Sequence, residues 1–325
     1  MAEGLWQEYR QMTGYRIIFM GTPEFSVPTL RSLFEEGENV VAVVTQPDKP
    51  KGRGRKISKS PVKVEAERHG CLVLQPQKPG TDEFIQQMEG LSADLLVVVA
   101  YGHILSEKIL SIPRKGAINI HASLLPKYRG AAPIQWAVIN GEKETGVTTM
   151  WMDAGMDTGD MLLASTLSIG SHDTAGALAA RLSVTGAQLL IETIDRLKHG
   201  TLKSIPQDSQ HVSYAPLLKK EDGRIDWTKS ASELDCFVRG MSPWPGAFTL
   251  LSGKRMRIYD VKPISGDPES RPGTTIPSFP GEWHVACGKG ILSILEVQAP
   301  SGKRLKIEDF LRGHPIAPGV APGRE

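Results

Sequence analysis

The first candidate for chemistry is the stretch GAINIHASLLPKYRG, residues 116–130, which carries an amide and an imidazole in a run typical of a buried strand. Residues i and i+2 of a strand point to the same face, so Asn119 and His121 project together while Ile118 and Ile120 pack on the other side. Burying the two polar groups without partners would cost about 1–3 kcal/mol each. The pair is either structural, bonded to nearby backbone, or part of a reactive site, and the strand alone does not separate these readings.

A second candidate is the acidic loop in ETGVTTMWMDAGMDTGDML, residues 144–162, which holds Asp153, Asp157 and Asp160 among glycines. Such loops are often turns or calcium sites, but this one lacks the Glu that an EF-hand loop carries at its twelfth position. A carboxylate near His121 would orient the imidazole and favour its charged form. Because no GxSxG nucleophile elbow is present, the sequence favours direct transfer between two bound substrates over a covalent acyl-enzyme.

A third candidate is the basic segment DKPKGRGRKISKSPVK, residues 48–63. It contains seven Lys or Arg from Lys49 to Lys63 and no acid in that span, with Gly52 and Gly54 making the loop flexible. The GRG triplet is not a dinucleotide fingerprint, because the third glycine is missing. The segment is either a solvated basic loop or a contact to the phosphates of a nucleic acid, which cation clusters bind by releasing counterions.

Composition and charge narrow the class of protein. The chain has 325 residues, 40% of them hydrophobic, and a formal net charge of +2, which is typical of a globular protein long enough for two domains. Its longest apolar run, residues 95–100, is far shorter than the roughly 20 residues of a membrane span, so we expect no membrane partner. Residues 1–15 mix acids and bases, unlike a signal or transit peptide, and this predicts a cytoplasmic protein.

The spacing of cysteine and histidine predicts no metal site. Cys71, Cys236 and Cys287 are widely separated and form no Cys-x-x-Cys pair, so reduced, buried thiols are expected rather than a disulfide framework or a zinc knuckle. The eight histidines include no His-Glu-x-x-His motif and no other paired ligand spacing.

The elements that must position these residues form two halves. Over residues 16–200 the short apolar runs RIIFM, VVAVV, CLVL, LLVVVA and AINIH alternate with amphipathic stretches, the pattern of a parallel sheet covered by helices. A longer helix, roughly residues 174–198, closes this half. If the strand with Asn119 and His121 is central, the pair lies near its carboxyl end, where open α/β sheets bind ligands.

The rhythm of the chain changes after residue 200. Residues 201–219 are polar and contain two prolines, which is typical of a linker. Beyond one helical piece in SASELDCFVRGM, short β-like runs spaced by Gly and Pro predict a small, mostly β domain over residues 220–325, either a barrel or a sandwich. We therefore expect an N-terminal extension, residues 1–15, an α/β domain, residues 16–200, a linker and a β domain.

Taken together, the segments resemble the methionyl-tRNA formyltransferase family from about residue 16 to the C-terminus. The resemblance rests on the order and spacing of FMGTPEFSVPTL, VVTQPDKPKGRGRKISKSPVK, VVVAYGHIL, INIHASLLPKYRGAAPIQWAVINGEKETGVT and MDAGMDTGDM, with RIDWTKSASEL and SPWPGAF in the second half. It implies a Rossmann-like formyltransferase catalytic domain with a parallel-rich sheet. It also implies a smaller OB-like β-barrel domain that helps to hold tRNA.

The resemblance implies roles for particular residues. The catalytic group would be Asn119, His121 and Asp157. The turn that follows the strand would line the pocket for 10-formyltetrahydrofolate, the formyl donor, with Ser123, Leu124, Leu125 and Pro126. The basic segment would meet the acceptor end of initiator methionyl-tRNA, where fraying exposes base edges, through Lys51, Arg53, Arg55 and Lys56. Neither a metal nor an obligate protein partner is implied.

Two other functions share some of these features. A formyltransferase acting on a sugar amine or a purine precursor would carry the same Asn, His, Asp and Ser-Leu-Leu-Pro features, but would need neither the cationic segment nor a tRNA-holding domain. An RNA-binding protein with a degenerate formyltransferase domain is a different class, and the intact set of catalytic residue types argues against it. These three functions can be distinguished by asking which amine, if any, the protein formylates.

Overall fold

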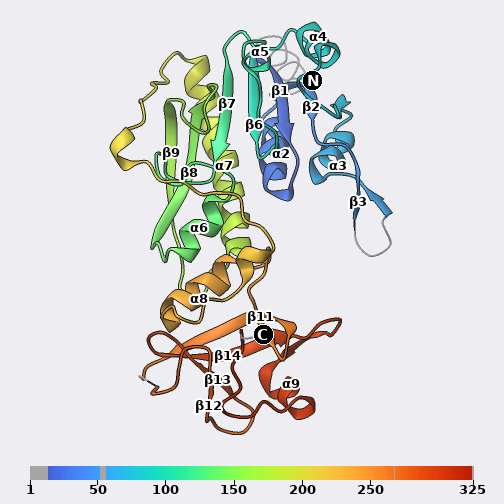
Figure 1. Ribbon diagram of the computed structural model, residues 1–325. Coiled ribbons are helices and arrows are strands. Elements are labelled where there is room, and N and C mark those ends of the chain that lie inside the picture. The colour runs from blue at the N-terminus through green and yellow to red at the C-terminus, as the bar shows by residue number, and fades with distance from the viewer. Residues whose placement is uncertain (1–13, 52–55, 267, 324–325) are drawn as a thin grey trace. The chain divides into compact units, whose positions relative to one another are not determined.

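The computed structural model describes residues 14–51, 56–266 and 268–323. The chain forms two compact units, and each has its own sheet (Figure 1). Unit 1 consists of the residues up to 130 together with 146–167 and 179–214. Unit 2 consists of residues 131–145, 168–178 and 215 onward. In the described part of the chain, no helix is both long enough and apolar enough to cross a membrane.

The first sheet has seven strands in the order β5-β2-β1-β6-β7-β8-β9. In chain order these are β1 (Arg16–Gly21), β2 (Asn39–Val44), β5 (Val73–Leu74), β6 (Leu95–Val99), β7 (Ala117–His121), β8 (Glu144–Trp151) and β9 (Met161–Ser168). The five strands from β5 to β7 pair in parallel, and β8 runs antiparallel to β7. The predicted parallel-rich α/β sheet is therefore confirmed, and the strand with the Asn and His is an inner one.

Helices cover both faces of this sheet. The α-helices are α2 (Val27–Glu35), α3 (Pro61–Arg68), α4 (Asp82–Gly90), α5 (Glu107–Leu110) and α7 (Ala175–Lys198). Two short 3-10 turns, η1 (Glu24–Ser26) and η2 (Ser209–His211), belong to the same unit. Residues of α4 and α5 share a core cluster with Val98 and Ala117, while Gly186 of α7 packs closely against Ile120. Since strand side chains alternate, Asn119 lies on the α4 and α5 side of the sheet, and α7 covers the opposite side.

The first crossover shows how the sequence fixes this geometry. The N-cap of α2 is Ser26, Pro28 stands in its first turn, and Gly37 follows its end with a left-handed φ of 72°. At the end of β1, a Cβ on Gly21 would come within 3.0 Å of Ser26 Cβ and of Val99 O. Only glycine fits there, because the chain must turn closely over the edge of the sheet.

The basic segment is described on either side of Gly52 and Gly54, and these two glycines, which the sequence predicts to make it flexible, lie outside the described residues. Short strands β3 (Lys49–Lys51) and β4 (Lys56–Ser58) pair in antiparallel fashion, and this hairpin projects from the rest of unit 1 (Figure 1). Lysine and proline in such a short strand pair keep it separate from the main sheet, because they are typical of edge strands that resist further pairing.

Unit 2 is built on a six-stranded sheet in the order β10-β11-β14-β13-β12, with β15 paired to β14. Its strands are β10 (Phe248–Leu251), β11 (Lys254–Ile264), β12 (Thr275–Ile276), β13 (Trp283–Ala286), β14 (Ile291–Gln298) and β15 (Arg304–Lys306). The helices, with one 3-10 turn, are α6 (Pro133–Ile139), η3 (Glu221–Gly223), α8 (Ala231–Gly240) and α9 (Ile307–Gly313). All of these strand pairs are antiparallel. The predicted smaller β domain is confirmed as a curled antiparallel sheet of the OB-like class.

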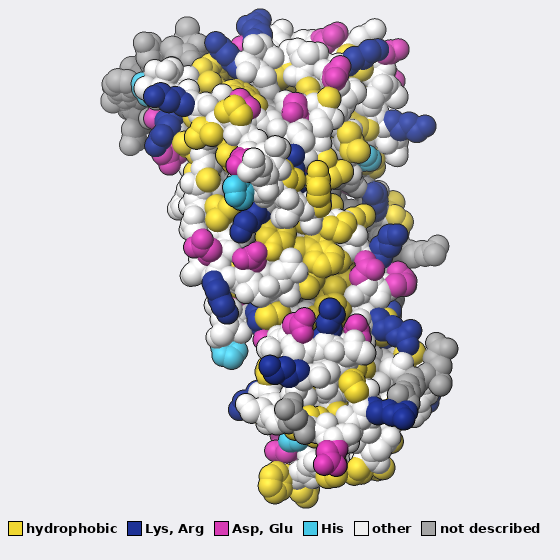
Figure 2. Space-filling model, turned by 60° about the vertical axis from the view of Figure 1, so that its left-hand side comes forward, with side chains coloured by type: hydrophobic (Ala, Val, Ile, Leu, Met, Phe, Trp, Pro, Cys, Tyr) yellow, Lys and Arg dark blue, Asp and Glu magenta, His cyan; other side chains and the backbone are white. Residues whose placement is uncertain are grey.

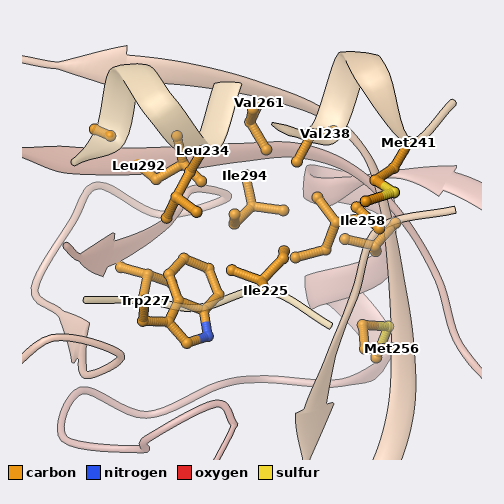
Figure 3. Packing of buried hydrophobic residues seen from close by; sticks show 14 of the residues in the cluster. Ile225, Trp227, Leu234, Val238, Met241, Met256, Ile258, Val261, Leu292 and Ile294 are labelled. Atoms are coloured by element: carbon orange, nitrogen blue, oxygen red, sulfur yellow. The ribbon is translucent and has the colours of Figure 1, made fainter. Parts of the chain in front are cut away.

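The core of unit 2 lies between α8 and its sheet (Figure 3). Leu234 and Val238 of α8 point toward the strand residues Ile258 and Ile294, and all four side chains are at most 2% exposed. The helix starts with a capping box in which Ser230 and Glu233 each bond the other's backbone N–H. This cap explains why SASELDCFVRGM forms a helix within an otherwise β-rich half.

Candidate active site

Asn119 and His121 lie at the carboxyl end of β7, between β6 and β8. The His121 side chain is only 6% exposed, whereas Asn119 is half-buried. A buried imidazole next to a half-buried amide on a rigid inner strand is a fixed set of hydrogen-bonding groups. This position at the edge of a parallel sheet is where α/β proteins bind ligands.

The structure brings Asp157 to both of these residues. Asn119 Nδ2 donates to Asp157 Oδ1 at 3.4 Å, and His121 Nδ1 lies 3.6 Å from Asp157 Oδ2. The same Oδ2 accepts a hydrogen bond of 2.8 Å from the backbone N–H of Gly130. The amide, the imidazole and the carboxylate therefore converge, although the carboxylate comes from a loop 38 residues along the chain from Asn119.

The second nitrogen of the His121 ring determines what the imidazole can do. Nε2 lies 2.9 Å from the carbonyl oxygen of Tyr128, and a carbonyl oxygen can only accept, so Nε2 carries the hydrogen. Nδ1, on the Asp157 side, is left as the nitrogen that can take up or release a proton. This arrangement fixes both the orientation and the tautomer of the ring.

The turn after β7 is held by its own hydrogen bonds. Ser123 Oγ donates to Lys127 O at 2.6 Å, while Thr148 Oγ1 donates to Ser123 O at 2.7 Å and accepts from Leu125 N at 3.2 Å. Leu124 and Pro126 remain half-buried. Because the polar groups of the turn already have partners, what it offers to a ligand is a firm apolar edge.

Side chains that the sequence analysis does not identify also contact this site. Gln207 Nε2 donates to the carbonyl oxygens of Asp157 and Gly159, and Arg129 donates two hydrogen bonds to Gln207 Oε1. Arg129 stands within the KYRG motif, where it could have been suspected. Gln207 lies in the polar segment expected to be a linker, and no spacing there signals a contact with the site.

The basic segment is only partly within the described residues. Arg53 and Arg55 lie outside them, and Lys51 and Lys56 are described for their backbone alone, in β3 and β4. The positions of these four side chains therefore stay a prediction. Basic and acidic side chains are interspersed on the face seen in Figure 2, in keeping with the small net charge of the chain.

A partly buried set of ion-pair and hydrogen-bond contacts lies at the base of the hairpin. Lys63 Nζ is 2.7 Å from Asp48 Oδ2 and also donates to Gln75 Oε1 at 2.7 Å, while Gln75 Nε2 donates to Asp48 Oδ1 at 2.8 Å. Lys59 pairs with Glu67 at 2.7 Å. At least two of the seven cations of this segment are thus engaged in ion pairs within the unit.

Among the described residues, no group of three or more His, Cys, Asp or Glu side chains is arranged to hold a metal ion. In the acidic loop, Asp153 Oδ1 instead accepts hydrogen bonds from Gly155 N at 3.0 Å and Thr158 Oγ1 at 2.6 Å, so it braces the loop. Of the three thiols, Cys287 is buried and Cys71 and Cys236 are half-buried.

The fold and these residues define the class of protein. The Formyl transferase family model matches residues 15–194, and the model for the C-terminal domain of formyl transferases matches residues 217–315. The first match covers both β7 and the Asp157 loop. This protein is therefore a member of the formyl transferases.

Proteins of similar sequence indicate which family of formyl transferases the chain belongs to. The chain is 52% identical over 314 residues to a methionyl-tRNA formyltransferase of Citrifermentans bemidjiense, covering 97% of this chain and 98% of the relative. It is 53% identical over 312 residues to that of Geobacter metallireducens, covering 96% and 100%. The chain belongs to the methionyl-tRNA formyltransferase family, which confirms the resemblance in the sequence.

A solved structure supports the fold at greater distance. The N-formyltransferase from Helicobacter canadensis, in complex with folinic acid and dTDP-3-aminofucose, superposes with a TM-score of 0.64. The alignment covers 90% of this chain and all of that one at 18% identity. At that identity the likeness establishes a shared fold, and the substrates of the two proteins need not agree.

Proposed function

We propose that this protein transfers the formyl group of 10-formyltetrahydrofolate to the α-amine of methionyl initiator tRNA, for translation initiation in the cytoplasm. The observation that carries the proposal is the contact of Asp157 with both Asn119 and His121 at the end of an inner strand. Relatives that share about half of the sequence are methionyl-tRNA formyltransferases, which supports this choice of acceptor.

The nucleophile needs only modest activation. An amine attacks a carbonyl carbon only when it is neutral, and an α-amino pKa near 8 leaves a usable neutral fraction at pH 7. The absence of a nucleophile elbow from the sequence agrees with direct attack on the formyl carbon. The protein's task is therefore to hold the two substrates in register, which supplies effective molarities of about 10⁵–10⁸ M in well-placed reactions.

Asn119 is suited to stabilise the charge that develops during attack. Negative charge accumulates on the formyl oxygen in the tetrahedral intermediate, and a donor fixed on a rigid strand stabilises it without reorganisation. Within the described parts of the chain, the hydrogen bond of Asn119 Nδ2 is a long one of 3.4 Å to Asp157, so this donor can turn toward a stronger acceptor.

His121 and Asp157 are suited to move the proton. The attacking amine must lose a proton and the departing folate nitrogen must gain one, and a positioned acid–base pair contributes about 10²–10⁴-fold to such a step. The tautomer set by Tyr128 O leaves His121 Nδ1 facing the carboxylate. We propose that the proton moves through Nδ1, directly or through water, while Asp157 holds the ring.

The formyl donor fits the turn after β7. A pterin is flat and largely apolar on its faces, and the half-buried Leu124 and Pro126 offer an apolar edge in the turn that follows the strand of Asn119. We propose that Ser123 to Pro126 line the folate site. A solved formyltransferase of the same fold contains folinic acid, in agreement with a folate-derived donor.

The acceptor is proposed to be held by parts of both halves of the chain. We propose a catalytic domain over residues 16–200, a linker over 201–219 and a tRNA-holding domain over 220–325, preceded by an extension of residues 1–15. The basic hairpin is proposed to contact the acceptor end through Lys51, Arg53, Arg55 and Lys56. Its cations would bind phosphates, with an affinity that falls as salt rises.

One experiment tests the proposed reaction. The protein is incubated with 10-formyltetrahydrofolate and, in separate reactions, with methionyl initiator tRNA, methionyl elongator tRNA and a nucleotide-linked amino sugar, and each acceptor is analysed by mass spectrometry. We expect formylation of the initiator tRNA far faster than of the other two. Formylation of the amino sugar with none on either tRNA would replace the proposal by the sugar-amine alternative.

A second experiment tests the role of the hairpin. Arg53→Ala is expected to raise KM for the charged tRNA while leaving KM for the folate nearly unchanged, because a phosphate contact affects only the acceptor. Lys59→Ala removes the same charge from the same segment, but from a side chain already paired with Glu67, and serves as the matched control. An equal loss of affinity for the tRNA and for the folate in Arg53→Ala would contradict the proposal that the hairpin contacts only the tRNA.

A further inference from the structure

The backbone of Asp157 adopts a conformation that the residue does not favour by itself. Its φ is +54°, in the left-handed region, which costs an ordinary L-residue about 1–2 kcal/mol. The residue lies in an irregular loop between β8 and β9. Asp tolerates this region better than most L-residues do, so the backbone conformation alone does not fix the loop, and contacts from outside the loop can help to aim the carboxylate at Asn119 and His121.

Gln207 supplies contacts of this kind. Its Nε2 donates to the carbonyl oxygen of Asp157 at 2.9 Å and to that of Gly159 at 2.7 Å. Its Oε1 accepts from Arg129 Nε at 3.0 Å and from Nη2 at 2.8 Å. A primary amide has two donor hydrogens and two acceptor lone pairs, so every hydrogen-bonding position of this side chain is used and only one orientation satisfies them.

Arg129 strengthens this arrangement. It is 8% exposed, and its guanidinium donates from two nitrogens to the amide oxygen of Gln207. A cation that donates to the amide oxygen polarises the amide, and this makes the two N–H groups on the other side of Gln207 better donors. The backbone of Arg129 is fixed as well, because its N–H donates to Ser213 O at 2.9 Å.

Arg129 also stands between two residues that touch the proposed catalytic group. The carbonyl oxygen of Tyr128 contacts His121 Nε2, and the N–H of Gly130 donates to Asp157 Oδ2. We propose that Gln207 and Arg129 form a positioning pair, which acts through the backbone of Asp157 to aim its carboxylate during formyl transfer. The proposal rests on the proposed function of the site and assigns to Gln207 a role in turnover, not in substrate affinity.

The decisive variant is Gln207→Glu. It preserves the size of the side chain and gives Arg129 a carboxylate partner, but it removes both N–H donors and places an oxygen against two carbonyl oxygens. We expect kcat to fall about 10- to 100-fold, by analogy with the loss caused by removing a hydrogen-bond partner that orients a metal-binding residue. KM for the folate and for methionyl-tRNA should change less than about 2-fold, and the variant should remain folded at the assay temperature, which its melting temperature checks. Gln210→Glu makes the same charge change at an exposed position three residues away and should behave as wild type.

A mutant cycle identifies the residue through which Gln207 acts. In an Asp157→Asn background, where the aimed carboxylate is gone, Gln207→Glu should lower the residual kcat by less than about 2-fold. A full 10- to 100-fold fall in that background, or a rise in both KM values with kcat unchanged, would overturn the positioning role. If Gln207→Glu does not fold, Arg129→Lys is the second test, because lysine cannot make the bidentate hydrogen bonds of Arg129 to the Gln207 amide oxygen. This variant must lower kcat by a smaller factor than Gln207→Glu is expected to, and the effect must vanish in the Asp157→Asn background. A wild-type protein that formylates no methionyl-tRNA would refute the proposed function separately.

Discussion

Asn119→Ala is the perturbation that best separates a reactive amide from a structural one. The only hydrogen bond recorded for the Asn119 side chain among the described residues is the 3.4 Å contact with Asp157, and the residue is half-buried. A neutral donor on a charged acceptor is worth about 1.5–3 kcal/mol when the geometry is good, but this one is long and partly hydrated. We therefore expect its removal to lower the free energy of unfolding by about 0.5–1 kcal/mol.

The expected loss in turnover is much larger. A preorganised donor to a developing oxyanion contributes about 2.7–4 kcal/mol to the transition state. At about 1.36 kcal/mol per factor of ten, this corresponds to a fall in kcat of about 100- to 900-fold. The two quantities differ because the hydrogen bond to Asp157 in the folded protein is long and partly hydrated, whereas a hydrogen bond to the developing oxyanion would be well aligned and shielded from water.

The assay pairs single-turnover formylation of methionyl-tRNA with urea unfolding of the same samples. Ile118→Val is the matched control, because Ile118 is its neighbour on the same strand, is fully buried and points to the opposite face. Its loss of one methyl group should cost about 0.5–1.5 kcal/mol of stability and leave kcat unchanged. If Asn119→Ala unfolds more readily than Ile118→Val while a folded fraction keeps wild-type turnover, the amide is structural and the reasoning fails.

Three further outcomes are expected. The hydrogen bond from Lys63 lowers the pKa of Asp48, so Asp48 stabilises the fold above its unfolded pKa near 4 and loses that contribution as pH falls through the lowered folded pKa. Asp48→Asn should therefore cost about 1.5 kcal/mol in urea unfolding at pH 7 and progressively less as the pH is lowered below about 4, and a cost that does not change with pH would contradict this. A Cβ at Gly146 would come within 2.2 Å of Ser165 O, so Gly146→Ala should lower stability by about 1–3 kcal/mol, measured by thermal melting. Burial raises the pKa of Cys287 to about 12, so a disulfide reagent at pH 8 should label it only after unfolding, and labelling in the native protein would contradict this.

The sequence predicts the part of the site that depends on strand periodicity. Asn119 and His121 share a face because side chains alternate along any strand, and Ile118 and Ile120 identify which face is buried. Asp157 is different, because it reaches the site from an irregular loop in a left-handed conformation, and no local pattern encodes that geometry. Its role is implied by the family resemblance, not by its neighbours in the chain.

The contacts that hold the loop could not be predicted, for a physical reason. Gln207 is a single polar residue in a polar segment, and its four hydrogen bonds reach residues 48 to 78 positions away in the sequence. Hydrophobic periodicity indicates which side of a helix or strand is buried. A single amide side chain that hydrogen-bonds to distant segments produces no such pattern in the sequence. The same limit applies to Asp48 and Gln75, which stand 27 residues apart at the base of the hairpin.

The three residues of the proposed catalytic group are held in place in two different ways. β7 fixes Asn119 and His121 because it is an inner strand paired on both sides, and changing their positions would break the sheet. Asp157 instead lies in an irregular loop, and its placement depends on hydrogen bonds from Gly130 and Gln207. Substitutions on the strand should therefore reduce stability or abolish a donor outright. Substitutions that weaken the hydrogen bonds around Asp157 should mainly lower kcat, with a smaller effect on the free energy of unfolding. The position of the Asp157 carboxylate is therefore easier to change by mutation than that of Asn119 or His121.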